Sequence, residues 1–273
     1  MSIAAENRGQ LLDTLPPLIR QMTSQEMWDT DETGLSQAAV FCGKKMVLKI
    51  EKENPTADQE YHMLSWLQGK LPVPRLLAFE RKDGRNYLLM ERLSGEMACA
   101  DSYMEDPARQ AEVLSNGLRL LWSTDISGCP YPDMTSRKLK LARERVEMGL
   151  VSIEDAEPET YGPGGFSNPR QLLFWLEEHQ PKEHPVLSHG DFCLPNIFGR
   201  GSQVTGFLDL GHCGIADPYQ DLALCFRSLK HNLEGNYGGP IRSNGNPRLL
   251  FEKLGMEPDW EKIRYYILLD ELF

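Results

Sequence analysis

One stretch of this 273-residue chain limits its fold more than any other, because polar residues stand at fixed distances after short apolar runs. Asp191 comes five residues before Asn196, and Asp209 follows thirteen residues later, directly after the run Gly206-Phe207-Leu208. Such a run is typical of a short buried strand, which would present Asp209 at its end. Gly211 then allows the chain to turn sharply. The pattern predicts a polar site built on a loop and a strand end.

The residue types in this pattern are those that phosphoryl transfer needs. A carboxylate has to lie near the proton of the accepting hydroxyl, and oxygen ligands have to hold Mg²⁺ against the phosphates. In kinases the catalytic Asp and a metal-binding Asn are five positions apart, and a second metal-binding Asp follows. Turn chemistry explains each short motif alone, but not their joint spacing. We therefore expect Asp191 to be catalytic, and Asn196 and Asp209 to bind the metal.

The chain resembles the aminoglycoside phosphotransferases, and most closely the 3′-phosphotransferases that inactivate kanamycin- and neomycin-type antibiotics. The resemblance runs nearly end to end. Two of its parts are not required by phosphoryl chemistry in general and so favour this subgroup. These two parts are Gly69 to Pro74 and Tyr265 to Phe273. The most specific parts of the resemblance are Leu187 to Asn196, Gly206 to Gly211, Ala216-Asp217 and Asp221 to Ala223.

The resemblance implies an α+β, two-lobed protein-kinase-like fold with a small antiparallel-sheet N-terminal lobe and a larger, mostly helical C-terminal lobe. It also implies ATP- or GTP-dependent, Mg²⁺-assisted transfer of the γ-phosphoryl group to an aminoglycoside hydroxyl, with the 3′-hydroxyl favoured. The pattern of the chain agrees with a change of structure near residue 94. Short apolar runs over 40–42, 46–50 and 86–91 predict strands, and turn residues such as Asp83-Gly84 separate them. Periodic apolar residues predict helices over 57–68, 107–122, 137–148, 169–178, 221–229 and 258–272. We expect a nucleotide-binding lobe over residues 1–93 and a catalytic, acceptor-binding lobe over 94–273.

Candidate nucleotide ligands lie in the first part of the chain. Lys49 ends the apolar run 46–48 and is expected to contact the α- and β-phosphates, with Glu60 of the following helix as its ion-pair partner. An exposed surface pair is the alternative. The resemblance adds Ser36 as a phosphate donor, and it places the adenine edge against the segment that contains Glu91 and Leu93.

Acceptor binding would require carboxylates for the ammonium groups of a polycation. A loop with four acids and no base supplies candidates, although such a run is more often a solvated loop. Acids at the end of the last predicted helix are opposed by the helix dipole, and a bound cation would relieve this. The candidates are Asp155, Glu157, Glu159, Asp270, Glu271 and the terminal carboxylate of Phe273.

Several positions depart from the family pattern or have a structural reading. Val47 stands where relatives carry an aromatic residue for stacking on adenine, which leaves the preference for ATP or GTP open. His231 stands where they carry a substrate-binding glutamate, and Glu234 is a possible replacement. Asp217 and Asp221 open a predicted helix, where carboxylates cap free amides.

Composition narrows the remaining choices. A net charge of −11 disfavours a nucleic-acid partner and would attract a polycation. The six cysteines show no Cys-x-x-Cys pair, which favours reduced thiols in the cytoplasm. The sequence shows no signal peptide and no membrane-spanning run. We expect a cytoplasmic monomer or weak dimer.

Two kinds of alternative function remain. A related kinase could act on another alcohol, such as a macrolide, choline or a sugar, and a choline site would want an aromatic cage. A protein from a different class could bind the nucleotide without catalysis, although the intact chemical set argues against this.

Overall fold

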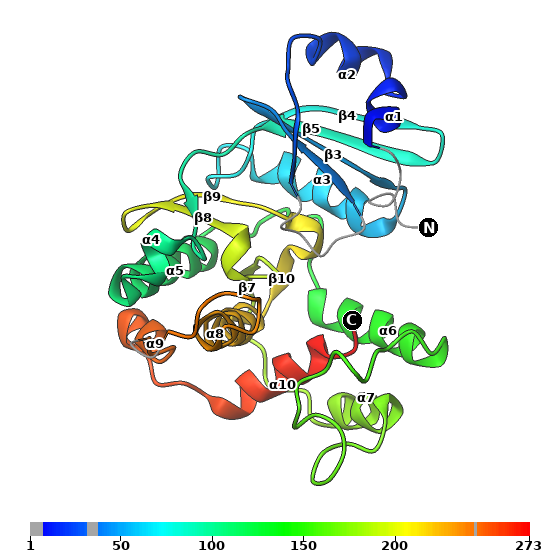
Figure 1. The fold of residues 1–273 in the computed structure, drawn as a ribbon. Helices are drawn as coiled ribbons and strands as arrows, with labels where there is room; N and C mark the ends of the chain where they lie inside the picture. The colour runs from blue at the N-terminus through cyan, green and yellow to red at the C-terminus, as the bar shows by residue number, and fades with distance from the viewer. Residues whose placement is uncertain (1–7, 32–37, 243–244) are drawn as a thin grey trace. The chain divides into compact units, whose positions relative to one another are not determined.

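The computed structural model describes residues 8–31, 38–242 and 245–273 of the chain. The chain divides into two compact units (Figure 1). One unit contains residues 1–95 together with 205–212, and the other contains 96–204 together with 213–273. The first holds an antiparallel sheet and the second holds mainly helices. The expected α+β class is therefore confirmed.

A five-stranded sheet with the order β1-β2-β3-β5-β4 forms the frame of the first unit, and all its neighbouring strands are antiparallel. The β4–β5 hairpin closes through Asp83 and Gly84, whose φ angles of 52° and 72° suit the tight turn predicted at these residues. The strands are β1 (Asp29–Asp31), β2 (Ala39–Cys42), β3 (Met46–Lys52), β4 (Leu76–Lys82) and β5 (Arg85–Glu91).

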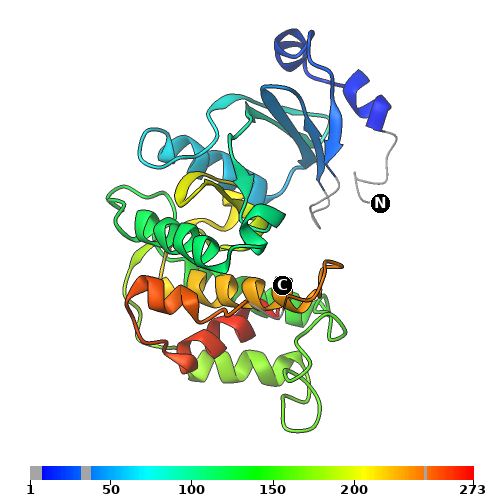
Figure 2. The same cartoon turned by 60° about the vertical axis from the view of Figure 1, so that its left-hand side comes forward.

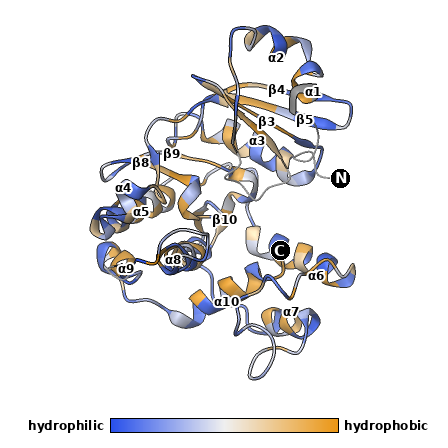
Figure 3. Ribbon diagram, viewed as in Figure 1, coloured by the Kyte–Doolittle hydropathy of each residue, from blue (hydrophilic) through white to orange (hydrophobic). Residues whose placement is uncertain are grey.

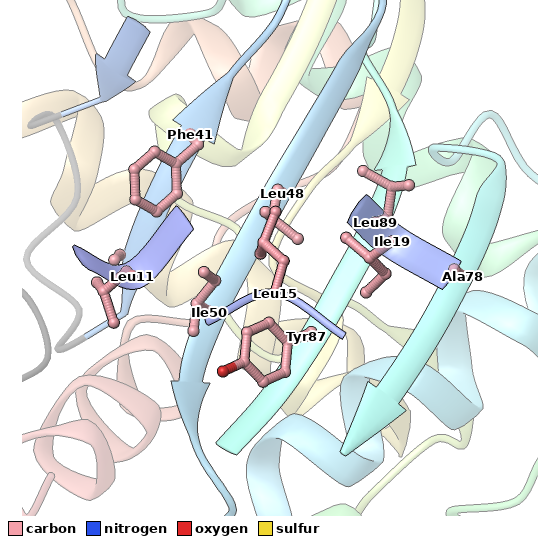
Figure 4. Packing of buried hydrophobic residues seen from close by; sticks show 10 residues of the cluster. Leu11, Leu15, Ile19, Phe41, Leu48, Ile50, Ala78, Tyr87 and Leu89 are labelled. Carbon is pink, nitrogen blue, oxygen red and sulfur yellow. The ribbon is translucent and has the colours of Figure 1, made fainter. Parts of the chain in front are cut away.

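The two faces of this sheet have different roles. Side chains of a strand alternate between faces, so Leu48 and Ile50 point to one face and Lys49 to the other. Two short helices, α1 (Arg8–Asp13) and α2 (Pro17–Met22), pack on the face that carries Leu48 and Ile50 (Figure 4). The sequence patterns did not indicate these helices. The core of that face consists of Leu11, Leu15, Ile19, Ala39, Phe41, Leu48, Ile50, Ala78, Tyr87 and Leu89.

Helix α3 (Pro55–Leu67) follows β3 and carries Glu60. The Asn54 side chain caps it by accepting the Ala57 N–H at 2.9 Å, and Pro55 occupies the first turn, where a missing N–H costs nothing. Its start and end differ by only a few residues from the helix predicted over 57–68.

Helices build most of the second unit. In Figure 2, α10 lies between α8 and α7, and it contacts both helices. Figure 3 shows that these helices carry polar and apolar residues, as helices with one buried face do. The helices are α4 (Asp101–Met104), α5 (Pro107–Trp122), α6 (Met134–Glu147), α7 (Pro169–Glu178), α8 (Pro218–Glu234), α9 (Leu249–Leu254) and α10 (Trp260–Asp270).

Short strands carry the loops of interest. β7 (Val186–Ser188) pairs with β10 (Gly214–Ala216), and it ends directly before His189. A second small sheet has the order β6-β8-β9, formed by β6 (Glu96–Met97), β8 (Ile197–Arg200) and β9 (Gln203–Phe207). The 3₁₀ turns η2 (Leu194–Asn196) and η3 (Leu210–His212) contain Asn196 and follow Asp209, respectively. Across the described ranges, every helix lacks the length or the apolar character that crossing a bilayer requires.

Candidate functional site

In the first unit, the ammonium group of Lys49 lies among three carboxylates. Its Nζ is 2.7 Å from Glu60 Oε2, 3.4 Å from Asp209 Oδ1 and 3.6 Å from Glu51 Oε1. The Lys49 side chain is 13% exposed and that of Glu60 6%, so this ion pair is not the surface pair that was the alternative. Lys49 and Glu60, expected in the nucleotide-binding lobe, and Asp209, expected in the catalytic lobe, thus lie in one cluster of the first unit.

Burial and charge set the ionisation of this cluster. Burial lowers the pKa of Lys49, but the carboxylates of Glu60, Asp209 and Glu51 outweigh it and hold that pKa well above its ordinary value. Burial raises the pKa of Glu60 to about 6, against the opposing effect of Lys49. Three carboxylates therefore surround one ammonium group.

The backbone directs Asp209 into the cluster. β9 ends at Phe207, and the φ of Asp209 is 56°, in the left-handed region that non-glycine residues seldom adopt. The following turn packs on α3, because a Cβ at Gly211 would lie 2.6 Å from Thr56 Cγ2. The predicted strand and turn around Asp209 are therefore present, with the strand ending one residue earlier than expected.

In the second unit, Asp191 and Asn196 are in contact. The Asn196 Nδ2 donates to the backbone oxygen and to Oδ2 of Asp191, both at 3.0 Å. This arrangement leaves the amide oxygen Oδ1 of Asn196 as the atom that could bind a metal. The thiol of Cys193 also hydrogen-bonds Asp191, and burial raises the pKa of that thiol well above its ordinary value.

A buried carboxylate on α8 holds the loop that carries Asp191. Asp221 accepts hydrogen bonds from the Ser188 hydroxyl at 3.0 Å, the His189 N–H at 2.8 Å and the Gly190 N–H at 2.9 Å. Burial raises the pKa of Asp221, and these donors act in the opposite direction.

This role of Asp221 differs from the helix-capping role that the sequence indicated. The cap of α8 is Asp217, which accepts the Tyr219 N–H at 3.0 Å. Asp221 lies in the first turn of α8, within the helix. Pro218 was the available signal, since proline favours the first helical position and therefore places Asp221 inside the helix.

Two acids of α10's C-terminal end contact cations of the chain itself. Asp270 Oδ1 lies 2.8 Å from Lys138 Nζ, and Asp270 Oδ2 accepts from Arg227. Burial raises the pKa of Asp270, but Lys138 and Arg227 together bring it below its ordinary value. Glu271 Oε1 lies 3.5 Å from the same arginine. Burial raises the pKa of Glu271 to about 7.

The acids of the loop over 154–160 differ in their contacts. Glu157 Oε1 lies 2.8 Å from His231 Nε2, and the Glu157 N–H donates to Glu271 Oε2 at 3.0 Å. Asp155 and Glu159 are exposed. Glu157 is thus the candidate of this loop that the structure brings together with the acids of the C-terminal end.

Two further acidic candidates, the terminal carboxylate of Phe273 and the side chain of Glu234, contact other residues of the second unit. The backbone oxygen of the terminal residue Phe273 accepts from Arg145 Nη2 at 2.6 Å, and the Phe273 ring lies 5.3 Å from Lys138 Nζ. Glu234, the last residue of α8, is exposed and accepts from Asn236 Nδ2 at 3.3 Å.

The expected adenine segment follows β5. Glu91 ends this strand and pairs with Arg75 at 2.5 Å, on the surface. The Leu93 side chain fills the space beside Gly206, and within the described residues the Leu93 N–H has no hydrogen-bond partner. Ser36 lies outside the described residues.

Comparison with known proteins defines the class first. The model of the phosphotransferase enzyme family matches residues 30–265, so the chain is a phosphotransferase. It is 36% identical to an aminoglycoside 3′-phosphotransferase of Enterococcus faecalis over 95% of this chain and 98% of the relative. The chain belongs to the aminoglycoside phosphotransferase family.

Solved structures agree with this assignment. The crystal structure of an aminoglycoside 3′-phosphotransferase of type VIII has a TM-score of 0.78, at 29% identity over 96% of this chain and 99% of that one. An aminoglycoside phosphotransferase from Streptomyces rimosus, solved in complex with ADP and streptomycin, has a TM-score of 0.71 at 26% identity, over 93% of this chain and 96% of that one. The expected protein-kinase-like fold is confirmed.

Proposed function

We propose that this phosphotransferase moves the γ-phosphoryl group of ATP or GTP to the 3′-hydroxyl of an aminoglycoside antibiotic, and so confers resistance to it. The observation that carries the proposal is the contact between Asp191 and Asn196 in a loop fixed by Asp221. The name of the Enterococcus faecalis relative supports the acceptor class and the 3′ position. The ADP complex of the Streptomyces rimosus enzyme supports a nucleotide donor.

In this proposal Asp191 accepts a hydrogen bond from the acceptor hydroxyl and orients it toward the γ-phosphorus. Position matters more than basicity here, because the transition state of phosphoryl transfer is loose. Asn196 limits the rotation of the Asp191 carboxylate by donating to Oδ2. The other oxygen, Oδ1, is then the natural acceptor for the substrate proton.

The residues present fit a magnesium ion. Asn196 offers an amide oxygen and Asp209 a carboxylate, and Mg²⁺ prefers a few oxygen ligands of this kind together with phosphates and water. The excess of carboxylate over ammonium around Lys49 agrees with a cation at Asp209. When bound, Mg²⁺ supplies charge compensation on the phosphate oxygens.

Lys49 is the proposed ligand of the α- and β-phosphates. Glu60 orients its ammonium, since the two atoms lie 2.7 Å apart and are buried. For the base, Leu93 offers a backbone N–H and the Glu91 segment offers carbonyl oxygens, and Ser36 is the proposed phosphate donor of the first hairpin. Val47 on β3 gives an apolar rather than an aromatic contact, so both ATP and GTP are retained as donors.

For the acceptor, Glu157 and Glu271 are the proposed ligands of ammonium groups. Asp270 is also a proposed ligand, and because each of its oxygens contacts a cation of the chain it orients Arg227 beside Glu271 as well. Asp155, Glu159 and the terminal carboxylate of Phe273 complete the proposed acidic set. A net charge of −11 favours the approach of a polycation, disfavours nucleic acid as partner, and is consistent with a cytoplasmic monomer or weak dimer.

A kinase for another alcohol is the second candidate. The likeness to a choline/ethanolamine kinase family protein of Mesorhizobium loti, at 13% identity and a TM-score of 0.62, shows the fold alone. A quaternary ammonium binds best in an aromatic cage. The acids at Glu157 and Glu271 favour primary ammonium groups instead.

The test is nucleotide consumption with Mg²⁺, ATP or GTP, and kanamycin, neomycin, a 3′-deoxy aminoglycoside, a macrolide or choline. Turnover with kanamycin, but not with the 3′-deoxy compound or with Asp191→Ala, is expected. Turnover with the macrolide or choline alone would identify a different acceptor. Nucleotide binding without turnover of any acceptor would favour a binding protein.

A further inference from the structure

His231 forms a chain of contacts that ends on the proposed acceptor ligand Glu157. Its Nε2 lies 2.8 Å from Glu157 Oε1, and its Nδ1 lies 3.3 Å from the hydroxyl of Tyr237. The two rings also pack edge to face, with centroids 5.7 Å apart. When Nδ1 accepts a hydrogen bond from the Tyr237 hydroxyl, the neutral imidazole carries its proton on Nε2. The Nε2–H then donates a hydrogen bond to Glu157.

Glu157 is therefore held at two points. Its side chain contacts His231 of α8, and its backbone N–H donates to Glu271 at the end of α10. The neighbouring acids Asp155 and Glu159 are exposed. Of the three candidate acids of this loop, Glu157 is the one held in place, and it lies beside Glu271.

We propose that His231 is a positioning residue for acceptor binding: its imidazole holds Glu157 in place for an ammonium group and, once protonated, competes with that ammonium for the same carboxylate. The inference rests on the proposed function. It predicts that acceptor binding weakens when the imidazole gains a proton. The neutral ring leaves Glu157 its negative charge, and the protonated ring cancels it.

Other ionisable groups surround this pair and have to be separated from it. Arg227 and Glu234 share α8 with His231, Glu271 approaches from α10, and Asp191 and Cys193 act on Tyr237 from the catalytic loop. The amines of the acceptor also titrate. A histidine variant that keeps the hydrogen bond and loses the charge isolates the imidazole from all of them.

The experiment measures kcat and KM for kanamycin from pH 6 to pH 8.5. His231→Gln places an amide N–H where Nε2 stands, and His231→Ala removes the contact. At pH 8 we expect His231→Gln to stay within about two-fold of the unsubstituted protein in KM, and His231→Ala to raise KM roughly five-fold, as for the loss of one hydrogen bond. Between pH 8 and 6, KM of the unsubstituted protein should rise about five-fold more than that of His231→Gln.

The control is His184→Gln, because the His184 side chain is exposed and it is the backbone N–H of His184 that donates to Asp217. It should reproduce the unsubstituted pH profile. Thermal unfolding of each variant separates a folding defect from a binding defect, and His231→Gln decides the case if His231→Ala does not fold. Identical pH profiles for the unsubstituted protein and His231→Gln would overturn the inference while leaving the proposed function intact. Failure of the unsubstituted protein to turn over any aminoglycoside would overturn both.

Discussion

The side-chain amide of Asn196 donates to the backbone oxygen and to the carboxylate of Asp191, at 3.0 Å in each case. One residue thereby holds both the backbone of the loop and the Asp191 carboxylate, which is the proposed catalytic group. Asp191→Ala should lower kcat for the proposed reaction by about 10²- to 10⁴-fold, the range for a positioned general base. Nucleotide binding, measured by calorimetry, should be unchanged. A kcat within about three-fold of the unsubstituted value would show that Asp191 is not the catalytic carboxylate.

The buried pair of Lys49 and Glu60 leads to a prediction for the nucleotide. Glu60→Gln keeps the size of the side chain but removes the charge that lies 2.7 Å from Nζ. Because a charge-assisted hydrogen bond contributes about 1.5–3 kcal/mol, kcat/KM for ATP should fall roughly 10- to 100-fold. The matched control is Glu91→Gln, which alters an exposed pair with Arg75 and should change kcat/KM by less than about three-fold.

Removal of Asp221 should destabilise the protein rather than alter its chemistry directly. Asp221→Ala removes the acceptor of the buried Ser188 hydroxyl and His189 N–H, and it leaves the Gly190 N–H only Ser188 Oγ at 3.1 Å. The expected loss is about 3–5 kcal/mol in the free energy of unfolding, measured by urea denaturation. Asp155→Ala, a substitution of an exposed loop acid, should stay within about 0.5 kcal/mol. Equal midpoints for the two variants would contradict the bracing role of Asp221.

Glu271 should make stability depend on pH. Its pKa is raised to about 7 in the folded protein, from an ordinary value of 4.5, so the folded state binds more protons than the unfolded state between those values. Stability therefore falls as pH rises from about 4.5 to 7. Glu271→Gln should remove this contribution, which is of the order of 1–3 kcal/mol.

The measurement is the urea midpoint of Glu271→Gln and of the unsubstituted protein at pH 5 and pH 8. The difference between the two proteins should favour the variant more at pH 8. A gap that is the same at both pH values would show that Glu271 ionises normally in the fold.

The sequence patterns predicted the elements whose signal is local. Strands β2, β3 and β5 and helices α3, α5 and α7 lie within a few residues of their expected positions, because alternation and helical spacing repeat within each of them. Helices α1 and α2 span six residues each, too few for a period to show. They form because Leu11 of α1 and Ile19 of α2 pack into the core on one face of the sheet, which is a tertiary interaction.

The candidate site divides in the same way. Lys49, Glu60, Asp191, Asn196 and Asp209 were predicted from spacing together with the family resemblance, and in the structure they form two groups of contacts. The contact of His231 with Glu157 could not be foreseen, because it joins residues 74 positions apart through the packing of α8 against a loop. His231, which stands where relatives carry a substrate-binding glutamate, thus contacts a carboxylate from another part of the chain.

The first compact unit is discontinuous, since residues 205–212 belong with residues 1–95. Residues 205–212 contact the rest of this unit at several points. Asp209 lies beside Lys49, the Leu93 side chain packs on Gly206, and the Phe207 N–H donates to the Pro72 oxygen at 3.0 Å. During synthesis these contacts cannot form until residue 212 has left the ribosome. Residues 1–95 therefore lack their contacts with 205–212 while more than a hundred further residues are synthesised. A fragment that stops at Gly95 should accordingly bind chaperones or be degraded, and coexpression of the remaining chain is needed to restore it.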